Sequence, residues 1–245
     1  MLSPQRHLQR GLSLVELMVG ITIGMIIAAG AAMVAVNQIG EHRRLMAETQ
    51  LQQDLRTAAD LIQQDLRRVG FRGAAQLGAW APATPSGTPE QPAEPNGYTA
   101  VTVTNDATEV RMDYSYARSA AAGGYQGLAA PAANEQFGVR WLRGNQTLYL
   151  KLGLNADGSP NWQPITDPES TPIVAFTVQP STQSMALDAF CDRPCPTGAT
   201  CTPPQLTLRQ FDISIRAQSH LDPRVLRTVT ITERVRADDQ TGACP

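Results

Sequence analysis

The longest apolar stretch of the chain lies near its amino terminus. Residues 17–36, LMVGITIGMIIAAGAAMVAV, contain one polar side chain, that of Thr22, and no charged side chain. A helix of this length rises by about 30 Å, which is the thickness of the hydrocarbon core of a bilayer. The pattern therefore predicts a transmembrane helix.

Beyond this stretch the apolar residues become periodic. They recur three or four positions apart at Leu51, Leu55, Ala58, Ile62, Leu66 and Val69. This spacing places them on one face of an amphipathic helix. Because no proline occurs between Pro4 and Pro82, we expect one continuous helix from about Leu12 to Val69.

The rest of the chain indicates a loop followed by β-strands. Residues 74–97 contain five prolines and few bulky apolar side chains, so we expect a linker or surface loop. Alternating apolar and polar residues predict strands at 98–104, 108–114, 137–143, 146–152, 172–180, 206–217 and 224–236. The first two strands and the next two are each expected to form an antiparallel hairpin, and a turn at 219–223 is expected to join the last two. The helix stripe is the expected cover for the sheet of the last two strands.

Composition and charge narrow the class of protein. The chain has 245 residues, of which 42% are hydrophobic, and a formal net charge of −2. This length allows one domain of ordinary size and an additional segment. The sequence contains no block of Lys or Arg, so the basic footprint of a nucleic-acid binder is missing and we infer no contact with nucleic acid.

All the cysteines lie in the last quarter of the chain, at Cys191, Cys195, Cys201 and Cys244. Their even number indicates two disulfides in an oxidising compartment, with three possible pairings that the sequence does not separate. A zinc site is the alternative, but the spacing lacks a Cys-x2-Cys knuckle and His220 has no second ligand nearby. We expect no metal and no cofactor.

The sequence offers no catalytic constellation. Neither His42 nor His220 lies beside a nucleophile motif, and no phosphate-binding glycine loop or His-Glu-x-x-His motif is present. Residues 155–159, NADGS, resemble the start of a calcium loop, but the glutamate at the twelfth position is missing, which favours an ordinary turn. We therefore expect that the chain is not an enzyme.

A carboxylate interrupts the start of the apolar run. Glu16 lies in RGLSLVELMV, residues 10–19, directly before the uncharged stretch. An unpaired acidic side chain inside a membrane helix costs on the order of 3 kcal/mol, so such a residue is a functional candidate. Arg6 and Arg10 precede it and favour retention of this end of the chain on the cytoplasmic side.

This stretch resembles the class III signal of type IV pilin-like proteins, which combines a short basic leader, Gly, an apolar residue, Ser/Thr-Leu-Val/Ile-Glu and an apolar helix. The resemblance implies that prepilin peptidase cuts after Gly11 and that the new amino-terminal residue, Leu12, is N-methylated. It implies that Glu16 neutralises the terminal amine of a neighbouring subunit during assembly. Leu12 stands where Phe is usual in the family.

Two further segments, LRTAADLIQQDLRRVGFRGA and RVLRTVTITERVRADD, are similar to minor pilins of the PilW type, which are related to J-type minor pseudopilins of type II secretion. The resemblance implies an α+β, pilin-like lollipop in which a long amino-terminal helix packs on an antiparallel β-sheet head. The implied divisions are a leader at 1–11, a transmembrane and assembly helix at 12–39, an amphipathic helix at 40–73, a Pro-rich loop at 74–97 and a β-rich periplasmic head at 98–245 with a Cys-rich carboxy-terminal region. A small-residue stripe for helix packing falls at Gly20, Gly24, Ala28 and Ala32.

The resemblance also implies a function: a structural minor pilin that helps initiate a type IV pilus and is incorporated into it. Its expected partners are prepilin peptidase, other minor pilins, the major pilin and a tip adhesin. It is expected in the inner membrane, with a cytoplasmic amino terminus before cleavage and a periplasmic head, and then in the filament at the cell surface. The alternatives are a J-type pseudopilin and a membrane-anchored periplasmic binding module. Cleavage by signal peptidase after Ala29-Gly30-Ala31 would instead release a soluble periplasmic protein.

Overall fold

The computed structural model describes residues 13–73, 78–118, 131–193, 196–197, 201–220, 222–236 and 239–244. The chain divides into two compact units, Met1–Met46 and Ala47–Pro245. Helix α1 (Leu14–Leu66) supplies residues to both units, and its 53 residues are continuous, as the lack of proline predicts.

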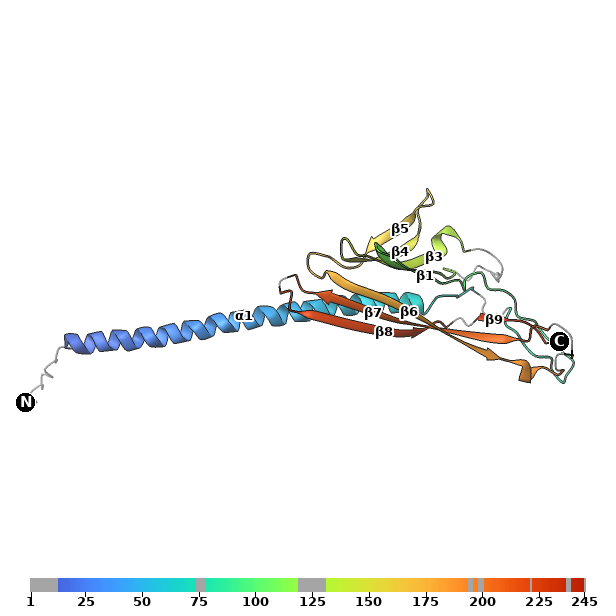
Figure 1. The fold of residues 1–245 in the computed structure, drawn as a ribbon, viewed down its shortest axis with the longest axis horizontal. Helices are drawn as coiled ribbons and strands as arrows, with labels where there is room; N and C mark the ends of the chain where they lie inside the picture. Colours follow the sequence, from blue (N-terminus) through green and yellow to red (C-terminus); the bar gives the residue numbers. More distant parts are fainter. Residues whose placement is uncertain are drawn as a thin grey trace, which may run out of the picture. The chain divides into compact units, whose positions relative to one another are not determined.

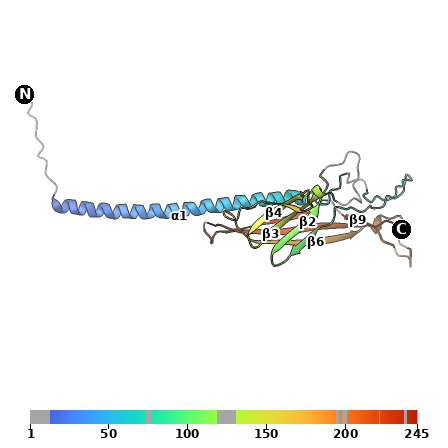
Figure 2. The same cartoon turned by 90° about the horizontal axis from the view of Figure 1, so that it is seen from above.

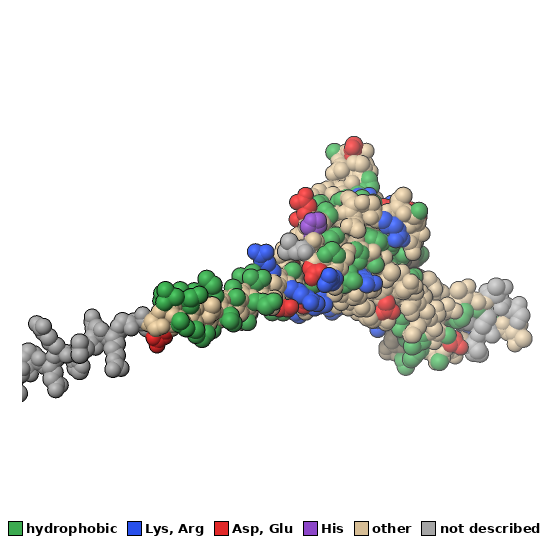
Figure 3. All heavy atoms as spheres, turned by 60° about the vertical axis from the view of Figure 1, so that its left-hand side comes forward, with side chains coloured by type: hydrophobic (Ala, Val, Ile, Leu, Met, Phe, Trp, Pro, Cys, Tyr) green, Lys and Arg blue, Asp and Glu red, His purple; other side chains and the backbone are tan. Residues whose placement is uncertain are grey.

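The first unit consists of an uncovered stretch of α1. The most apolar 18-residue window of the helix has a mean hydropathy of 2.3 and none of it is buried. Figure 3 shows hydrophobic side chains over most of the visible surface of this unit. Within the described residues, α1 is the one helix long and apolar enough to cross a membrane.

The second unit begins with the amphipathic part of α1. Each of the six residues of the predicted stripe is at most 1% exposed, from Leu51 to Val69. The predicted apolar face is therefore confirmed. The helix is followed by turns, and Gly70 takes a φ of 78°, which favours glycine, while its N–H donates to the Ser115 carbonyl at 3.0 Å.

Two antiparallel sheets complete the second unit (Figure 1). The first has the order β1-β2-β3-β4-β5, with β1 (Thr102–Asn105), β2 (Glu109–Ser115), β3 (Gln136–Leu142), β4 (Thr147–Leu154) and β5 (Pro160–Pro164). The second has the order β6-β7-β8, with β6 (Ile173–Ala186), β7 (Gln205–Gln218), β8 (Leu226–Arg234) and β9 (Asp239–Thr241), the last paired with β7. Two short 3-10 helices span Ala133–Glu135 and Asp188–Phe190.

The predicted hairpins are confirmed, but the strand boundaries differ. β1 pairs with β2, β3 with β4 and β7 with β8, all antiparallel. Residues 98–101 are not a strand, because the Asn96 side chain accepts the N–H of Tyr98 at 3.0 Å and a turn forms there. β6 continues past Pro180 to Ala186, which an edge strand tolerates because its outer N–H groups need no partner.

The two sheets share one hydrophobic core with the helix. The core includes Leu55 and Ile62 of α1, Met112 of β2, and Phe176 and Ile213 of the second sheet. Figures 1 and 2 show the carboxy-terminal part of α1 running along β6, β7 and β8. This is an α+β architecture in which a long helix packs on antiparallel sheets.

Polar contacts also hold the helix against the strands. The Asp65 carboxylate accepts hydrogen bonds from the hydroxyls of Tyr114 and Tyr116, each at 3.0 Å. Glu233 of β8 accepts one from Gln63 at 2.6 Å and forms an ion pair with Arg67 at 3.2 Å. The end of α1 is therefore tied to β2 and its continuation on one side and to β8 on the other.

Burial is the largest influence on Asp65, and it raises the pKa of this carboxyl above the ordinary value of 3.8. The two tyrosine hydroxyls and the nearby Arg68 and Arg118 oppose that effect, because they favour the charged form. Burial and the neighbouring Asp65 in turn raise the pKa of Tyr116 to about 12. Both hydroxyls therefore stay protonated at neutral pH and can donate to Asp65.

We expect Ile62→Ala to lower the free energy of unfolding of the second unit by about 2–5 kcal/mol, because it opens a cavity in the core shared by both sheets. Ile62 is 0% exposed, whereas its neighbour Leu61 is 38% exposed. Leu61→Ala is the matched control and should change stability by less than about 0.5 kcal/mol. Thermal unfolding of the full chain in detergent, followed by tryptophan fluorescence, measures both; equal losses would contradict the assigned helix face.

We expect Asp65→Ala to cost about 1–3 kcal/mol, because two tyrosine hydroxyls lose their acceptor. Asp65→Asn keeps an acceptor oxygen and should cost less. Since the folded pKa of Asp65 is raised, its contribution to stability is present below pH 3.8 and is lost as the pH rises through the folded pKa. Asn lacks this dependence, so the wild type should lose stability relative to Asp65→Asn over that window in urea unfolding; a constant difference would contradict the raised pKa.

Candidate functional site

The residues of the predicted processing site adjoin the start of α1. Gly11 and Leu12 lie outside the described residues, and the helix begins at Leu14, with the Leu17 N–H donating to the Ser13 carbonyl at 3.1 Å. Glu16 lies in the first turn and is exposed. A carboxylate at this position is also stabilised by the positive end of the helix dipole, by about 0.3–1 kcal/mol.

No basic residue lies near Glu16 along the helix sequence. Residues 13–40 contain no Lys, Arg or His, and the run that follows Glu16 is apolar and exposed. In a membrane or among packed helices, this carboxylate therefore needs a partner from elsewhere, either a terminal amine or a group on another chain. The assembly role of Glu16 stays a prediction.

The small-residue stripe lies on an open surface of α1. Gly20, Gly24, Ala28 and Ala32 are all exposed, and a Cβ built on Gly20 or Gly24 would meet no atom within 4 Å. The face is therefore available for the close approach of another helix. Its use in packing stays a prediction.

The structure selects among the possible disulfides. Cys191 and Cys244 are bonded, with their Cα atoms 5.5 Å apart and a sequence separation of 53. Cys201 is also disulfide-bonded, and Cys195 lies outside the described residues. Of the three pairings that the sequence leaves open, one contains the Cys191–Cys244 bond.

The Pro-rich loop is fastened to the cysteine-rich region, which the sequence did not indicate. Glu90 accepts hydrogen bonds from the Trp80 indole at 2.6 Å and from the Cys244 N–H at 2.7 Å. The Trp80 N–H donates to the Gln240 side chain at 2.8 Å, and the Trp80 ring lies edge-on to Phe190 at 6.5 Å. Residues 78–97 are thus a surface loop held against the carboxy-terminal segment.

Residues 155–159, which resemble the start of a calcium loop, lie in the turn between β4 and β5. The Asp157 carboxylate accepts the hydroxyl of Ser159 at 2.6 Å and its N–H at 2.9 Å, and these bonds lower the pKa of Asp157. The residues therefore form an ordinary turn. Among the residues that the structure describes, no three His, Cys, Asp or Glu side chains come together as a metal site.

Trp162 lies in a segment that is not among the strands expected from the sequence. It lies in β5, and its ring faces Gly138 of β3, where an added Cβ would lie 3.4 Å from the indole. The Arg140 guanidinium stacks over the same ring at 4.4 Å from its centre. Periodicity missed β5 because PNWQP has two prolines and no apolar alternation.

Two known families match the chain. The family model of prepilin peptidase-dependent protein B matches residues 44–237, which is well over half of the sequence. The prokaryotic N-terminal methylation motif matches residues 6–32, a range that contains Gly11, Leu12 and Glu16. No curated protein and no solved structure gives a significant match.

We expect the double variant Cys191→Ser/Cys244→Ser to lose about 2–4 kcal/mol of unfolding free energy, because the loop it opens has a sequence separation of 53. The matched variant Cys195→Ser/Cys201→Ser opens a much shorter loop and should lose about half as much. Thermal unfolding of oxidised protein measures both. Peptide mapping without reduction should join the Cys191 and Cys244 peptides; a Cys191 peptide linked to Cys195 or Cys201 would contradict the assignment.

Proposed function

The chain belongs to the prepilin peptidase-dependent protein B family, and from this membership we propose that it is a minor pilin. In this role it is a structural, non-catalytic subunit that helps initiate a type IV pilus and is incorporated into the filament. The observation that carries the proposal is Glu16, which lies within the methylation motif and in the first turn of an exposed apolar helix.

Processing creates the partner that Glu16 lacks. We propose that prepilin peptidase cleaves between Gly11 and Leu12 and that Leu12 is then N-methylated. The new amine lies four residues before Glu16, a rise of about 6 Å along a helix. Because residues 13–40 carry no other cation, an amine from Leu12 is the cation best placed to pair with Glu16. Pairing between neighbouring subunits would couple assembly to processing.

Cleavage also changes the charge of the chain. The leader holds Arg6 and Arg10, two of the 20 Lys and Arg, and no acidic residue. The mature chain keeps 18 basic and 22 acidic residues, which gives a formal charge of −4 before the new amine is counted. The basic end is thus removed after it has served to orient the helix in the membrane.

The proposed location is the inner membrane before assembly, with the head in the periplasm. The apolar part of α1 is consistent with membrane anchoring, and the Cys191–Cys244 disulfide suits an oxidising compartment. In the filament, the uncovered face at Gly20 and Gly24 would pack against helices of other subunits. We propose other minor pilins, the major pilin and a tip adhesin as those partners.

We expect Glu16→Ala to leave cleavage intact and to lower incorporation into sheared pili by at least about tenfold. The terminal amine of the neighbouring subunit would lose its carboxylate, and an unpaired charge in the apolar filament core costs about 3 kcal/mol. Glu41→Ala is the matched control, since Glu41 lies on the same helix beyond the apolar run. Immunoblotting of sheared pili and of membranes measures incorporation. Wild-type incorporation of Glu16→Ala would contradict the assembly contact.

The mature amino terminus tests the processing step separately. Intact-mass measurement should give a chain that starts at Leu12 and carries one additional methyl group. A start at Ala32 would instead indicate signal peptidase and would overturn the pilin assignment. Recovery of the chain with a secretion pseudopilus, and not with sheared pili, would identify the J-type alternative.

A further inference from the structure

A cavity of about 620 Å³ opens beside the end of α1, within the second unit. Four of its eight lining residues are arginines: Arg67, Arg68, Arg118 and Arg236. Its other walls are apolar or aromatic, and Phe71 is the most exposed of them, at 39%. The cavity therefore combines positive charge at its rim with an apolar floor.

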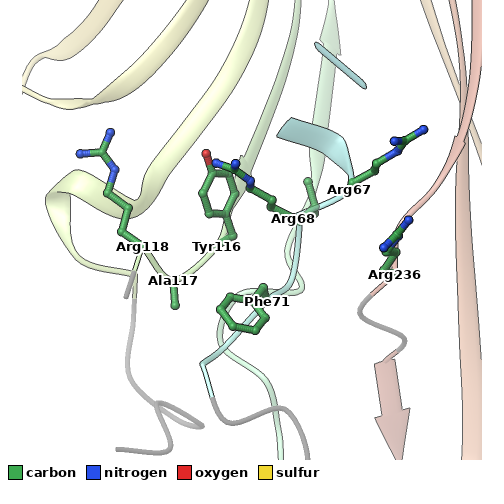
Figure 4. A pocket seen from close by; sticks show the side chains of 8 residues that line it. Arg67, Arg68, Phe71, Tyr116, Ala117, Arg118 and Arg236 are labelled. Carbon is green, nitrogen blue, oxygen red and sulfur yellow. The ribbon is translucent and has the colours of Figure 1, made fainter. Parts of the chain in front are cut away.

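The arginines come from three distant parts of the sequence. Arg67 and Arg68 directly follow α1, Arg118 lies beyond β2 and Arg236 lies beyond β8. In Figure 4, Arg118 and Arg67 lie on opposite sides of the view, with Arg68 between them and Arg236 below Arg67. Their charges are thus spread around the cavity and do not converge on one point.

Helix capping accounts for only part of this cluster. Cations near a helix end are favoured by its dipole, which explains Arg67 and Arg68. Arg118 and Arg236 do not belong to the helix, yet they line the same cavity. Both side chains are exposed, so neither belongs to the hydrophobic core.

The carboxylates of the chain neutralise this charge only in part. Among the residues that the structure describes, no Asp or Glu lines the cavity. Arg67 is paired with Glu233 at 3.2 Å, and Asp65 lies near Arg68 and Arg118 but is engaged by two tyrosine hydroxyls. Glu135 also lies close to Arg118, because it accepts the Arg118 backbone N–H at 3.2 Å. Among the described residues, three carboxylates therefore stand against four guanidinium groups.

The adjoining segments outside the described residues add little negative charge. Segments 74–77 and 119–130 contain no Asp or Glu, and segment 237–238 contains one, Asp238. In a chain with a net charge of −2, this concentration of arginine is a local exception. A ligand with several negative groups would compensate it.

Aromatic contacts hold two of the arginines in place. The Arg68 guanidinium lies 5.9 Å from the centre of the Tyr116 ring, and that of Arg118 lies 5.5 Å from the centre of the Phe137 ring. A guanidinium over a ring keeps its N–H groups available for a carboxylate, which it can bind through two parallel hydrogen bonds. These side chains are therefore positioned to receive an anion.

The arrangement favours an extended acidic ligand over a compact anion or a nucleic acid. Separated arginines match several separated carboxylates better than a single phosphate. Tyr116 is already stacked on Phe137 at 3.9 Å, and both rings are buried. Among the described lining residues Phe71 is therefore the one exposed ring, whereas binding of successive bases uses several such rings. The apolar floor suits an apolar side chain between the acidic ones.

We propose that this cavity is a docking site for an acidic peptide segment of a partner protein, with carboxylates on either side of an apolar residue. The cavity belongs to the head, and the proposal goes beyond the minor-pilin function and does not depend on it. Arg118 and Arg236 supply the charges, and Phe71 contacts the apolar residue.

The test is binding of the peptide Asp-Glu-Leu-Asp-Glu, blocked at both ends and carrying a neutral dye, to the full chain in detergent. Fluorescence anisotropy should give a dissociation constant that weakens with salt, because the contacts are ionic. Arg118→Gln/Arg236→Gln should weaken binding by at least about tenfold. The matched control Arg56→Gln/Arg224→Gln makes the same charge change at exposed positions outside the cavity and should leave binding unchanged.

Three further probes separate the alternatives. The peptide Asn-Gln-Leu-Asn-Gln should not bind, and inorganic phosphate should compete no better than sodium chloride at equal ionic strength. If oligo-dT bound more tightly than the acidic peptide, and Arg118→Gln/Arg236→Gln abolished that binding, the ligand of the cavity would be a nucleic acid and the proposal would be overturned. Absence of peptide binding, or equal weakening by both double variants, would overturn the proposal; circular dichroism shows that each variant is folded.

Discussion

The contact between one face of α1 and two separate sheets is the interaction on which the head depends. The five-stranded and four-stranded sheets share no paired strands, and one backbone hydrogen bond links them where the Ile173 N–H at the start of β6 donates to the Gln146 carbonyl, directly before β4, at 2.8 Å. They are held together mainly through side chains, and the helix stripe from Leu51 to Val69 is completely buried in their common core. The helix is thus an internal part of the head, and the arginines and tyrosines at its end are held in place by the same contact.

The same helix carries two different surfaces. The pattern of apolar side chains changes between them, while the backbone continues as one helix. Up to residue 36 almost every position is apolar, whereas from Leu51 onward only every third or fourth position is. A fully apolar surface suits lipid or other helices, and a stripe suits a single protein core. Glu16 belongs to the first surface and Asp65 to the second, and each carboxylate needs a partner that suits its surroundings.

The sequence predicts features that depend on local pattern and misses those that depend on distant residues. The helix, its buried face and three hairpins follow from periodicity, and Gly11, Leu12 and Glu16 stand in a fixed register that needs no fold. β5 was missed because its prolines hide its pairing with β4, and β9 because it is too short for alternation. The arginine cavity and the link between Glu90 and Cys244 join residues that are far apart in the chain, so no local signal marks them.

The disulfide between Cys191 and Cys244 has a mechanical consequence. It encloses β7, β8 and β9 in a covalent loop with a sequence separation of 53. Under tension the chain would extend only outside this loop, and the bond prevents extension of roughly 180 Å of contour length, at about 3.4 Å per residue. A force that enters the chain at Cys244 would pass through the bond into Cys191 and bypass the strands between them. The sheet that packs on the helix is thereby protected from the pulling force.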